Sequence, residues 1–444
     1  MDQGVPPKLF DDLTKAADLV RGHEFIHIFS HYDADGLSSA AILVKTLLRE
    51  EKEFCVTLLT TLDDETFKEI AESDAGCIMI ADLGASYIKE LDALKADIVV
   101  LDHHTVKDKA ERISYVNPHL YGIDGMSFGC GSTMACLFAI QMDEGNWDLV
   151  QLAFAGMCGD KQEMKLLNSY LLKGGVERGY LEVEEGLIIP FGKLTDELFL
   201  TTGPYIRGVS GNAEGVAKLL TDSGISRSAE SKDLTEEERR KLSSLIILQL
   251  IEQGVSKSTI EDVSGARYLL KDWDVDSSGL ASLLDGCGRN MLTGLGVAAA
   301  CGDEESIKIA KETEKEYRRE VVLSAVELDK RGLTAEENIQ WFDSSRSGYT
   351  GVLCNIAMSY FSDLSKPTFG INSADEISKV SGRATGDLLS KGVDLSIALN
   401  EVCEAVGGSG GGHQIASGGS FPSDLKNEFL RRLDTKIGAQ FTAK

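Results

Sequence analysis

Three short apolar stretches near the N-terminus are each followed at once by aspartate, or by aspartate together with histidine. The stretches cover residues 25–30, 77–80 and 98–101 and have the length and composition of β-strands. The segments between them read as helices, so this region predicts a βαβ alternation and a parallel sheet. Residues just past the carboxyl ends of parallel strands converge on one edge of the sheet. We therefore expect these aspartates and histidines to meet in space.

The residues after the three stretches are candidate metal ligands. They are His31, Asp33 and Asp35 after the first, Asp82 after the second, Asp102, His103 and His104 after the third, and Asp160 after a helix-like run at 149–158. Taken singly, each aspartate is more typical of a turn or a helix cap. Together they offer carboxylate oxygens and imidazoles, which suit manganese, magnesium or zinc, and they exceed the needs of one ion. The pattern predicts a two-metal hydrolytic centre.

These four elements resemble the DHH phosphoesterase superfamily. Its pattern is a histidine or aspartate leading into D-x-D, a lone aspartate after the third strand, an Asp-His-His triplet and a later lone aspartate. Far downstream, residues 410–418 (GGGHQIASG) are similar to the GGGHxxAxG signature of the DHH-associated C-terminal domain. Two independent motifs in the right order favour membership of this superfamily.

The resemblance implies a division of roles among the ligands. One metal would be held by His31, Asp33 and Asp82. The second would be held by Asp35, Asp82, His103 and Asp160, so that Asp82 bridges the two. Asp102 would orient the triplet, and His104 would contact the scissile phosphate. Manganese is the favoured metal and magnesium the alternative.

A second candidate site lies near the C-terminus. The simplest interpretation of the glycines at 407–412 is a flexible linker. Because His413 and small residues follow at once, we interpret them as a tight turn whose backbone amides approach an anion. The predicted phosphate-binding residues are Gly411, Gly412, His413, Arg383 in an S-x-R element, and Arg289. Arg289 ends residues 279–289, which resemble an LLNACGR-like stretch of archaeal RecJ-type nucleases, and residues 202–211 are similar to their Pro-Tyr segment.

The sequence predicts an α/β protein with three regions. Residues 1–190 would form a DHH catalytic domain with a parallel sheet flanked by helices, and residues 191–335 a mainly helical insert. Residues 336–444 would form an α/β DHH-associated domain that binds nucleic acid, separated from the first by a cleft. In the insert, Thr235 to Glu238 is a capping box, and Asp303 precedes a long charged helix.

The formal net charge of −26 argues against a long duplex-binding surface, because a nucleic-acid binder usually shows a basic footprint. A narrow basic channel remains compatible with this charge. Its candidate residues are Arg207, Arg289, Arg346, Lys379 and Arg383. The acidity favours a nuclease that handles short or end-bound single strands.

Composition also bears on where the protein works. The nine cysteines are an odd number and form no CxxC pair, which is typical of buried thiols in a reducing cytoplasm. No stretch approaches 18 apolar residues, so we predict no membrane span.

The best interpretation is a manganese-dependent, archaeal-type RecJ-like exonuclease that hydrolyses single-stranded DNA or RNA in replication or repair. One alternative is a phosphodiesterase for short oligonucleotides or cyclic dinucleotides, although those relatives are typically smaller. A family II pyrophosphatase is less favoured, because that group lacks the GGGH signature. A third class is a replication scaffold, since the resemblance implies that archaeal members bind the GINS complex. The resemblance implies either polarity of digestion, 5′→3′ or 3′→5′.

Overall fold

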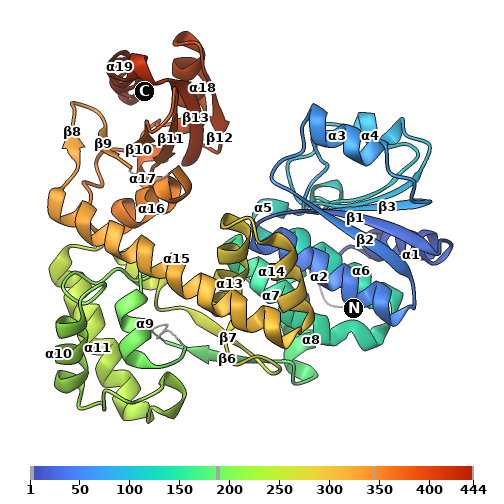
Figure 1. Cartoon of the computed structure of the whole chain (residues 1–444), viewed down its shortest axis with the longest axis horizontal. Helices are drawn as coiled ribbons and strands as arrows, with labels where there is room; N and C mark the ends of the chain where they lie inside the picture. Colours follow the sequence, from blue (N-terminus) through green and yellow to red (C-terminus); the bar gives the residue numbers. More distant parts are fainter. Residues whose placement is uncertain (1–4, 187–190, 345–346, 443–444) are drawn as a thin grey trace. The chain divides into compact units, whose positions relative to one another are not determined.

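The computed structural model describes residues 5–186, 191–344 and 347–442 (Figure 1). The chain divides into two compact units. The first unit contains Met1–Glu185 and Ala266–Glu316, and the second contains Gly186–Gly265 and Tyr317–Lys444. The helical segment expected at 191–335 is therefore divided between the two units, because residues 266–316 pack with the N-terminal region.

A five-stranded parallel sheet forms the centre of the first unit, with the strand order β2-β1-β3-β4-β5. Its strands are β1 (Phe25–His31), β2 (Glu53–Leu59), β3 (Cys77–Ala81), β4 (Asp97–Leu101) and β5 (Ser114–Val116). The helices between and before them are α1 (Pro7–Arg21), α2 (Ala34–Arg49), α3 (Asp64–Ala71) and α4 (Ile88–Asp92). The predicted parallel sheet with flanking helices is confirmed.

Side chains of the central strands alternate between two apolar cores, as the two-residue period of a strand requires. On β3, Cys77 and Met79 belong to a core shared with α1, α2 and further helices, whereas Ile78 and Ile80 face the core of α3 and α4. Figure 1 shows these two layers of helices on opposite faces of the sheet. Strands covered on both faces read as continuous apolar runs.

The rest of the first unit is mainly helical and completes the larger core. Its elements are α5 (Gly125–Phe128), α6 (Gly131–Met142), α7 (Val150–Gly159), α8 (Leu166–Glu177), α13 (Ser277–Arg289) and α14 (Thr293–Cys301). Strands β6 (Leu181–Glu185) and β7 (Ala266–Leu270) pair antiparallel. Helix α13 packs against α7 and α2. The C-terminal end of α13, which contains Arg289, is therefore part of the same unit as the predicted metal ligands.

The second unit begins with a helical region. Its helices are α9 (Leu194–Leu200), α10 (Ala213–Ser223), α11 (Glu236–Gln253) and α12 (Lys257–Asp262). They share a core with the second half of α15 (Glu304–Arg331) and with α16 (Thr350–Tyr360). The predicted capping box is present, since Thr235 and Glu238 exchange hydrogen bonds at the start of α11.

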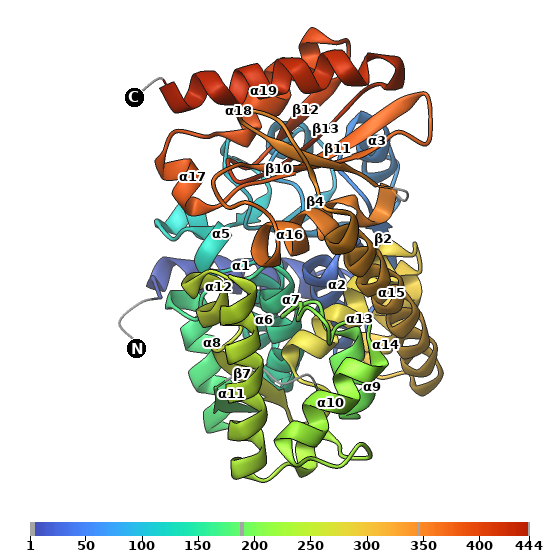
Figure 2. The same ribbon diagram turned by 90° about the vertical axis from the view of Figure 1, so that its left-hand side faces the viewer.

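A six-stranded sheet completes the second unit, with the order β12-β13-β11-β10-β9-β8. The strands are β8 (Thr334–Ala335), β9 (Gln340–Asp343), β10 (Thr368–Asn372), β11 (Ile377–Arg383), β12 (Ser409–Gly412) and β13 (Ala416–Pro422). Its other helices are α17 (Gly386–Ser390), α18 (Leu395–Ala405) and α19 (Lys426–Thr442). Figure 2 shows α18 and α19 on one side of this sheet and α16 on the other. This is the predicted C-terminal α/β fold.

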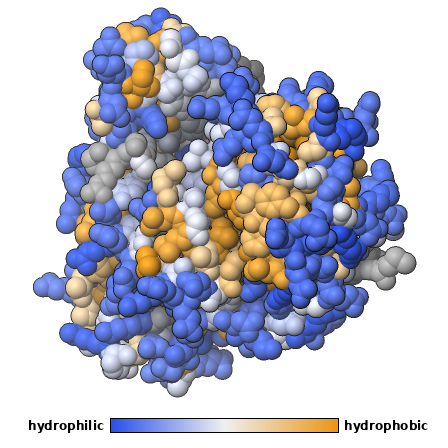
Figure 3. All heavy atoms as spheres, turned by 45° about the vertical axis from the view of Figure 1, so that its right-hand side comes forward, coloured by the Kyte–Doolittle hydropathy of each residue, from blue (hydrophilic) through white to orange (hydrophobic). Residues whose placement is uncertain are grey.

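Hydrophilic residues form most of the outline of the face drawn in Figure 3, in keeping with a charged fraction of 26%. Among the helices of the described residues, none combines the length and the hydropathy needed to cross a bilayer.

Candidate metal centre

The predicted ligands lie at the carboxyl ends of three neighbouring strands. His31 is the last residue of β1, Asp82 follows β3 directly, and Asp102 follows β4 directly. Since β1 pairs with β3 and β3 with β4, the three ends are adjacent in the sheet. The parallel topology thus brings together side chains that are about 70 residues apart in sequence.

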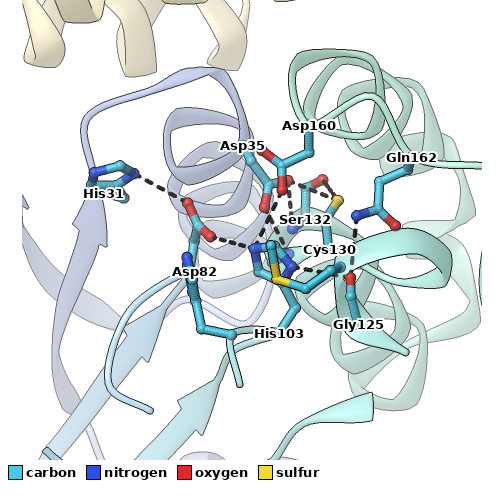
Figure 4. A network of polar contacts seen from close by, with 12 residues as sticks. His31, Asp35, Asp82, His103, Gly125, Cys130, Ser132, Asp160 and Gln162 are labelled. Atoms are coloured by element: carbon cyan, nitrogen blue, oxygen red, sulfur yellow. Dashed lines mark hydrogen bonds and ion pairs between the residues drawn. The ribbon is translucent and has the colours of Figure 1, made fainter. Parts of the chain in front are cut away.

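Asp82 lies between two histidines (Figure 4). Its Oδ2 is 3.5 Å from Nδ1 of His31, and its Oδ1 is 3.2 Å from Nε2 of His103. The side chain is almost fully buried. One carboxylate therefore presents a different oxygen to each imidazole, which is the arrangement expected of a ligand that bridges two ions.

The backbone of Asp82 is strained. Its φ angle is +56°, in the left-handed region that residues other than glycine rarely adopt. Its N–H donates to the carbonyl oxygen of Leu101 at the end of β4. Strained positions of this kind are often found at functional sites, where the surrounding structure holds them in place.

The candidate ligand atoms form three groups, and the third, described with the triplet below, is Asp82, Asp102, His103 and His104. In the first, Nδ1 of His31 lies 2.9 Å from Oδ2 of Asp33. The other oxygen of Asp33 accepts the Gly36 N–H at 3.0 Å and so caps α2. The ligand atoms of His31, Asp33 and Asp82 lie within 4.8 Å of one another, which is close enough to share one ion.

The second group contains Asp35, His103 and Asp160, whose ligand atoms also lie within 4.8 Å of one another. Asp160 directly follows α7, and its Oδ2 is 3.3 Å from Nε2 of His103. Asp35 is fixed at the N-terminus of α6. Its carboxylate accepts hydrogen bonds from the Gly131 N–H at 2.7 Å, the Ser132 N–H at 3.0 Å and the Cys130 thiol at 2.9 Å.

His103 and His104 differ in surroundings although they are adjacent. Nδ1 of the buried His103 donates to the carbonyl oxygen of Gly125 at 3.1 Å, so its Nε2 is the atom that faces the carboxylates. Nδ1 of His104 contacts Oδ1 of Asp102 at 2.7 Å, and 44% of the His104 side chain is exposed. Its Nε2 is thus available to a molecule from solution.

Asp102 is fully buried, and both of its oxygens are already occupied. Oδ1 accepts the N–H groups of His103 and His104 as well as the His104 ring, and Oδ2 accepts the Ala85 N–H at 2.7 Å. These hydrogen bonds fix the carboxylate, and one of its oxygens lies within 4.8 Å of ligand atoms of Asp82, His103 and His104. Its geometry suits a residue that orients the two histidines.

The protonation of the metal-free centre reflects an excess of carboxylates. Burial favours neutral groups, yet hydrogen bonds to Asp33 and Asp82 raise the pKa of His31 to about 11. Burial and the charge of Asp82 raise the pKa of Asp35 to about 6, and burial with the charge of Asp35 raises the pKa of Asp160 well above its ordinary value. For Asp82, hydrogen bonds to His103 and His31 outweigh burial and lower the pKa. Buried carboxylates whose pKa is raised in this way fit a site for cations.

The basic residue Arg289 is connected to the same centre. It lies at the end of α13, and its guanidinium group contacts Oδ2 of Asp285 at 3.3 Å. Oδ1 of Asp285 accepts the N–H of Ala34, which lies between two candidate ligands, at 3.2 Å. The structure therefore places Arg289 one carboxylate away from the start of α2, where Asp33 is the N-cap and Asp35 lies in the first turn.

The C-terminal candidates lie together on the second sheet. Arg383 on β11 pairs with Ala416 of β13, and the His413 N–H donates to the carbonyl oxygen of that same Ala416. Nε of Arg383 donates to Oδ1 of Asn355 at 2.7 Å, while His413 is exposed.

The glycines differ from the expected tight turn. Gly411 and Gly412 belong to the edge strand β12, and the turn itself comprises residues 413–415. Close packing explains two neighbouring glycines. A Cβ at Gly410 would lie 2.5 Å from the carbonyl oxygen of Leu399 on α18, and one at Gly419 would lie 2.6 Å from Sγ of Cys403.

The other basic candidates are scattered. Arg207 pairs with Asp329 at 2.6 Å, and Lys379 is exposed on β11. Arg346 lies outside the described residues. Sequence reasoning missed the groups that contact the candidate ligands and their loops, namely Gly125, Cys130, Gly131 and Asp285. The small residues at the start of α6 were the available signal for the Asp35 contacts, whereas Asp285 had none.

Comparisons with known proteins agree with this arrangement. Residues 25–157 match the DHH family, N-terminal domain, and residues 344–439 match the DHHA1 domain. An uncharacterised protein of Methanocaldococcus jannaschii is 32% identical over 449 residues, which is 98% of this chain and 98% of that protein. The fold and the site thus define a DHH phosphoesterase. The chain belongs to the DHH family, with an N-terminal DHH domain and a C-terminal DHHA1 domain.

Solved structures show the same fold at low identity. The exonuclease RecJ bound to manganese superimposes with a TM-score of 0.61 and 16% identity, over 97% of this chain and 94% of that one. CDC45 from Entamoeba histolytica superimposes with a TM-score of 0.68 and 12% identity, over 98% and 100%. The predicted likeness to the RecJ-type fold is confirmed.

Proposed function

We propose that this protein is a manganese-dependent exonuclease that hydrolyses phosphodiester bonds of single-stranded DNA or RNA, with a role in replication or repair. The observation that carries the proposal is the position of Asp82, whose two oxygens lie 3.5 Å and 3.2 Å from His31 and His103. A buried carboxylate shared by two ligand groups is what a two-metal phosphoesterase requires.

Each ion would have its own set of side chains. One set is His31, Asp33 and Asp82, and the other is Asp35, Asp82, His103 and Asp160. When bound, two such ions lower the pKa of a water molecule and polarise the phosphate during in-line displacement. Manganese is the metal we favour, supported by the manganese-bound RecJ structure, and magnesium is the alternative.

The remaining residues of the triplet act on the substrate. Burial favours the neutral ring, yet the hydrogen bond that Nδ1 of His104 donates to Asp102 raises the pKa of His104. In the protonated ring, Nε2 carries a second proton on the side away from Asp102. From there His104 donates a hydrogen bond to a non-bridging oxygen of the scissile phosphate. This bond strengthens as negative charge develops on that oxygen in the transition state.

Substrate binding is assigned to basic and small residues away from the ions. Arg289 would contact a phosphate near the centre. In the DHHA1 domain, phosphates further along the strand would contact Arg383, Gly411, Gly412 and His413. An open hairpin turn with exposed backbone and an adjacent arginine suits a phosphate of the nucleic-acid backbone.

The replication role has one supporting observation, the likeness of the whole chain to CDC45. We therefore include binding of the GINS complex in the proposal as a second role of an active enzyme. Co-purification of the full chain with purified GINS tests this role. Absence of a complex at micromolar concentrations would remove it and leave the nuclease proposal intact.

Digestion of end-labelled strands tests the proposed activity. DNA and RNA oligonucleotides labelled at either the 5′ or the 3′ end are incubated with manganese, with magnesium or with EDTA. We expect nucleotides to be released from one end with manganese and no release with EDTA. Cleavage of cyclic dinucleotides or dinucleotides alone would replace the exonuclease by the small-substrate phosphodiesterase, and activity in EDTA would overturn the two-metal mechanism.

A further inference from the structure

Gln162 is a buried neutral side chain close to the centre, and none of the roles above uses it. It lies two residues after Asp160, and only 8% of it is exposed. Its Oε1 accepts the Gly129 N–H at 2.7 Å and the side-chain N–H of Asn168 at 3.2 Å, and its Nε2 donates to the carbonyl oxygen of Gly125 at 3.2 Å. Both ends of the carboxamide are therefore fixed.

The carbonyl of Gly125 has a second donor, Nδ1 of His103 at 3.1 Å (Figure 4). A carbonyl oxygen only accepts hydrogen bonds, so this contact places a proton on Nδ1 and reserves Nε2 for the carboxylates or an ion. The two backbones are also in close contact, since a Cβ at Gly125 would lie 2.4 Å from the His103 carbonyl oxygen. The position of one carbonyl thus sets the orientation of the His103 ring.

We propose that Gln162 is the positioning residue of the second ion, because it holds the Gly125 carbonyl that orients His103. The inference rests on the proposed metal centre and adds a residue to it. Groups that hold a metal-binding histidine through its other ring nitrogen typically change metal affinity about 10- to 100-fold when removed. Gln162 acts on His103 through one backbone carbonyl, that of Gly125.

The network continues toward another ligand of the same ion. Oδ1 of Asn168 accepts the hydroxyl of Thr133 at 2.8 Å. Thr133 lies in the first turn of α6, whose N-terminal amides bind Asp35. Gln162 is therefore linked to His103 and to the helix that holds Asp35, while the hydrogen bonds described for it do not extend to His31 or Asp33. This asymmetry predicts that its loss affects one ion and spares the other.

The first test is calorimetric titration of the metal-free full chain with Mn²⁺, together with elemental analysis. We expect two ions in the wild type. Gln162→Met keeps the volume and removes all three hydrogen bonds, so it should weaken one site about 10- to 100-fold and leave the other unchanged. If this variant does not fold, Gln162→Glu keeps the acceptor for Gly129 and removes the donor to Gly125, and the same loss at one site is expected.

A matched control separates positioning from general stability. Gln151 is also buried in the first unit and makes three side-chain hydrogen bonds, to Asp148 and Asp272. Gln151→Met should lower the melting temperature by a similar amount and keep both ions. Equal metal loss in both variants, or two unchanged sites in Gln162→Met, overturns the role of Gln162. A wild type that binds no Mn²⁺ overturns the metal centre itself and the inference with it.

Discussion

At Asp82, one side chain supplies an oxygen to each of two ligand groups. We predict that Asp82→Ala abolishes exonuclease activity and loses both ions, because each site loses a ligand and the two like charges are no longer bridged. Removing a residue that only supports a metal ligand lowers the metal affinity by about 10- to 100-fold. Removing Asp82 itself should lower the metal affinity further. Nucleotide release and metal content by elemental analysis measure both effects. Unchanged activity would exclude the bridging role.

The two histidines of the triplet should separate binding from turnover. His103→Ala should lose metal from one site, because its Nε2 faces Asp82 and Asp160. His104→Ala should keep both ions and lose turnover by about 100- to 1000-fold, as expected when a donor to developing negative charge is removed. Elemental analysis of the two purified variants decides between them. Equal metal loss in both would show that this division of roles is wrong.

Metal binding should release protons, because the metal-free centre is protonated at its ligands. The pKa of His31 is raised to about 11, so its Nδ1 holds a proton at neutral pH that an ion must displace. The apparent affinity for Mn²⁺ should therefore rise as the pH increases from 6 to 9. Below pH 6 it should fall further, since Asp35, with a pKa of about 6, also becomes protonated.

Calorimetric titrations in two buffers of different ionisation enthalpy measure these protons. At pH 7.5 the observed enthalpy should depend on the buffer. An enthalpy that is independent of the buffer would mean that the ligands are already deprotonated.

Among the elements, α13 supports the loop that contains the first ligands. Gly288 is buried there, and a Cβ would lie 2.0 Å from the carbonyl oxygen of Tyr32, between His31 and Asp33. Gly288→Ala should destabilise the fold by about 1–3 kcal/mol, as overpacking usually does, and weaken Mn²⁺ binding at the first group. Thermal unfolding in EDTA and calorimetric titration measure the two effects.

Gly294 in α14 is the matched control for Gly288. A Cβ at Gly294 meets nothing within 4 Å, so Gly294→Ala should leave the stability unchanged or slightly raised and both metal sites intact. If Gly288→Ala binds Mn²⁺ as the wild type does, α13 does not control the geometry of the ligand loop.

The elements that the sequence predicted best are those whose pattern is local. β1, β3 and β4 were evident because their apolar runs end in charged residues, and the capping box marks the start of α11. The pairing of β6 with β7 could not be predicted from the sequence, because these strands are about 80 residues apart. The transfer of residues 266–316 to the first unit depends in the same way on packing between distant segments.

The candidate site shows the same contrast between local sequence patterns and contacts between distant segments. Its candidate ligands could be named from motifs, since parallel strands bring their ends together whatever the details, and their binding of metal stays a prediction. The groups that support them could not be named, because Gln162 and Asp285 bind backbone atoms of Gly125 and Ala34, which are distant from them in sequence. The glycines at 407–412 were interpreted as an anion-binding turn, and the packing of Gly410 and Gly419 against α18 had no signal in the sequence.

For the whole molecule, a net charge of −26 makes the binding of nucleic acid depend on a few basic side chains at particular positions. We predict that Arg383→Ala and His413→Ala weaken binding of single-stranded oligonucleotides and barely change hydrolysis of a small chromogenic phosphodiester. Both residues lie in the DHHA1 domain, which contains none of the proposed ligands. A lost phosphate contact from a charged side chain is worth roughly 1–3 kcal/mol, and it should reduce the slope of log affinity against log salt by roughly 0.7.

The dependence of cleavage on strand length is the sharper test of the DHHA1 domain. The wild type should prefer strands of several nucleotides over dinucleotides, because a longer strand, as we propose, gains the DHHA1 contacts in addition to those of the metal centre. Arg383→Ala should lose this preference. Arg432→Ala, which removes an exposed arginine paired with Glu428 on α19, should keep it. If the wild type cleaves dinucleotides best and ignores longer strands, the substrate is a small phosphodiester. The helices α9 to α12 would then have to serve a protein partner, because a dinucleotide is too short to need them.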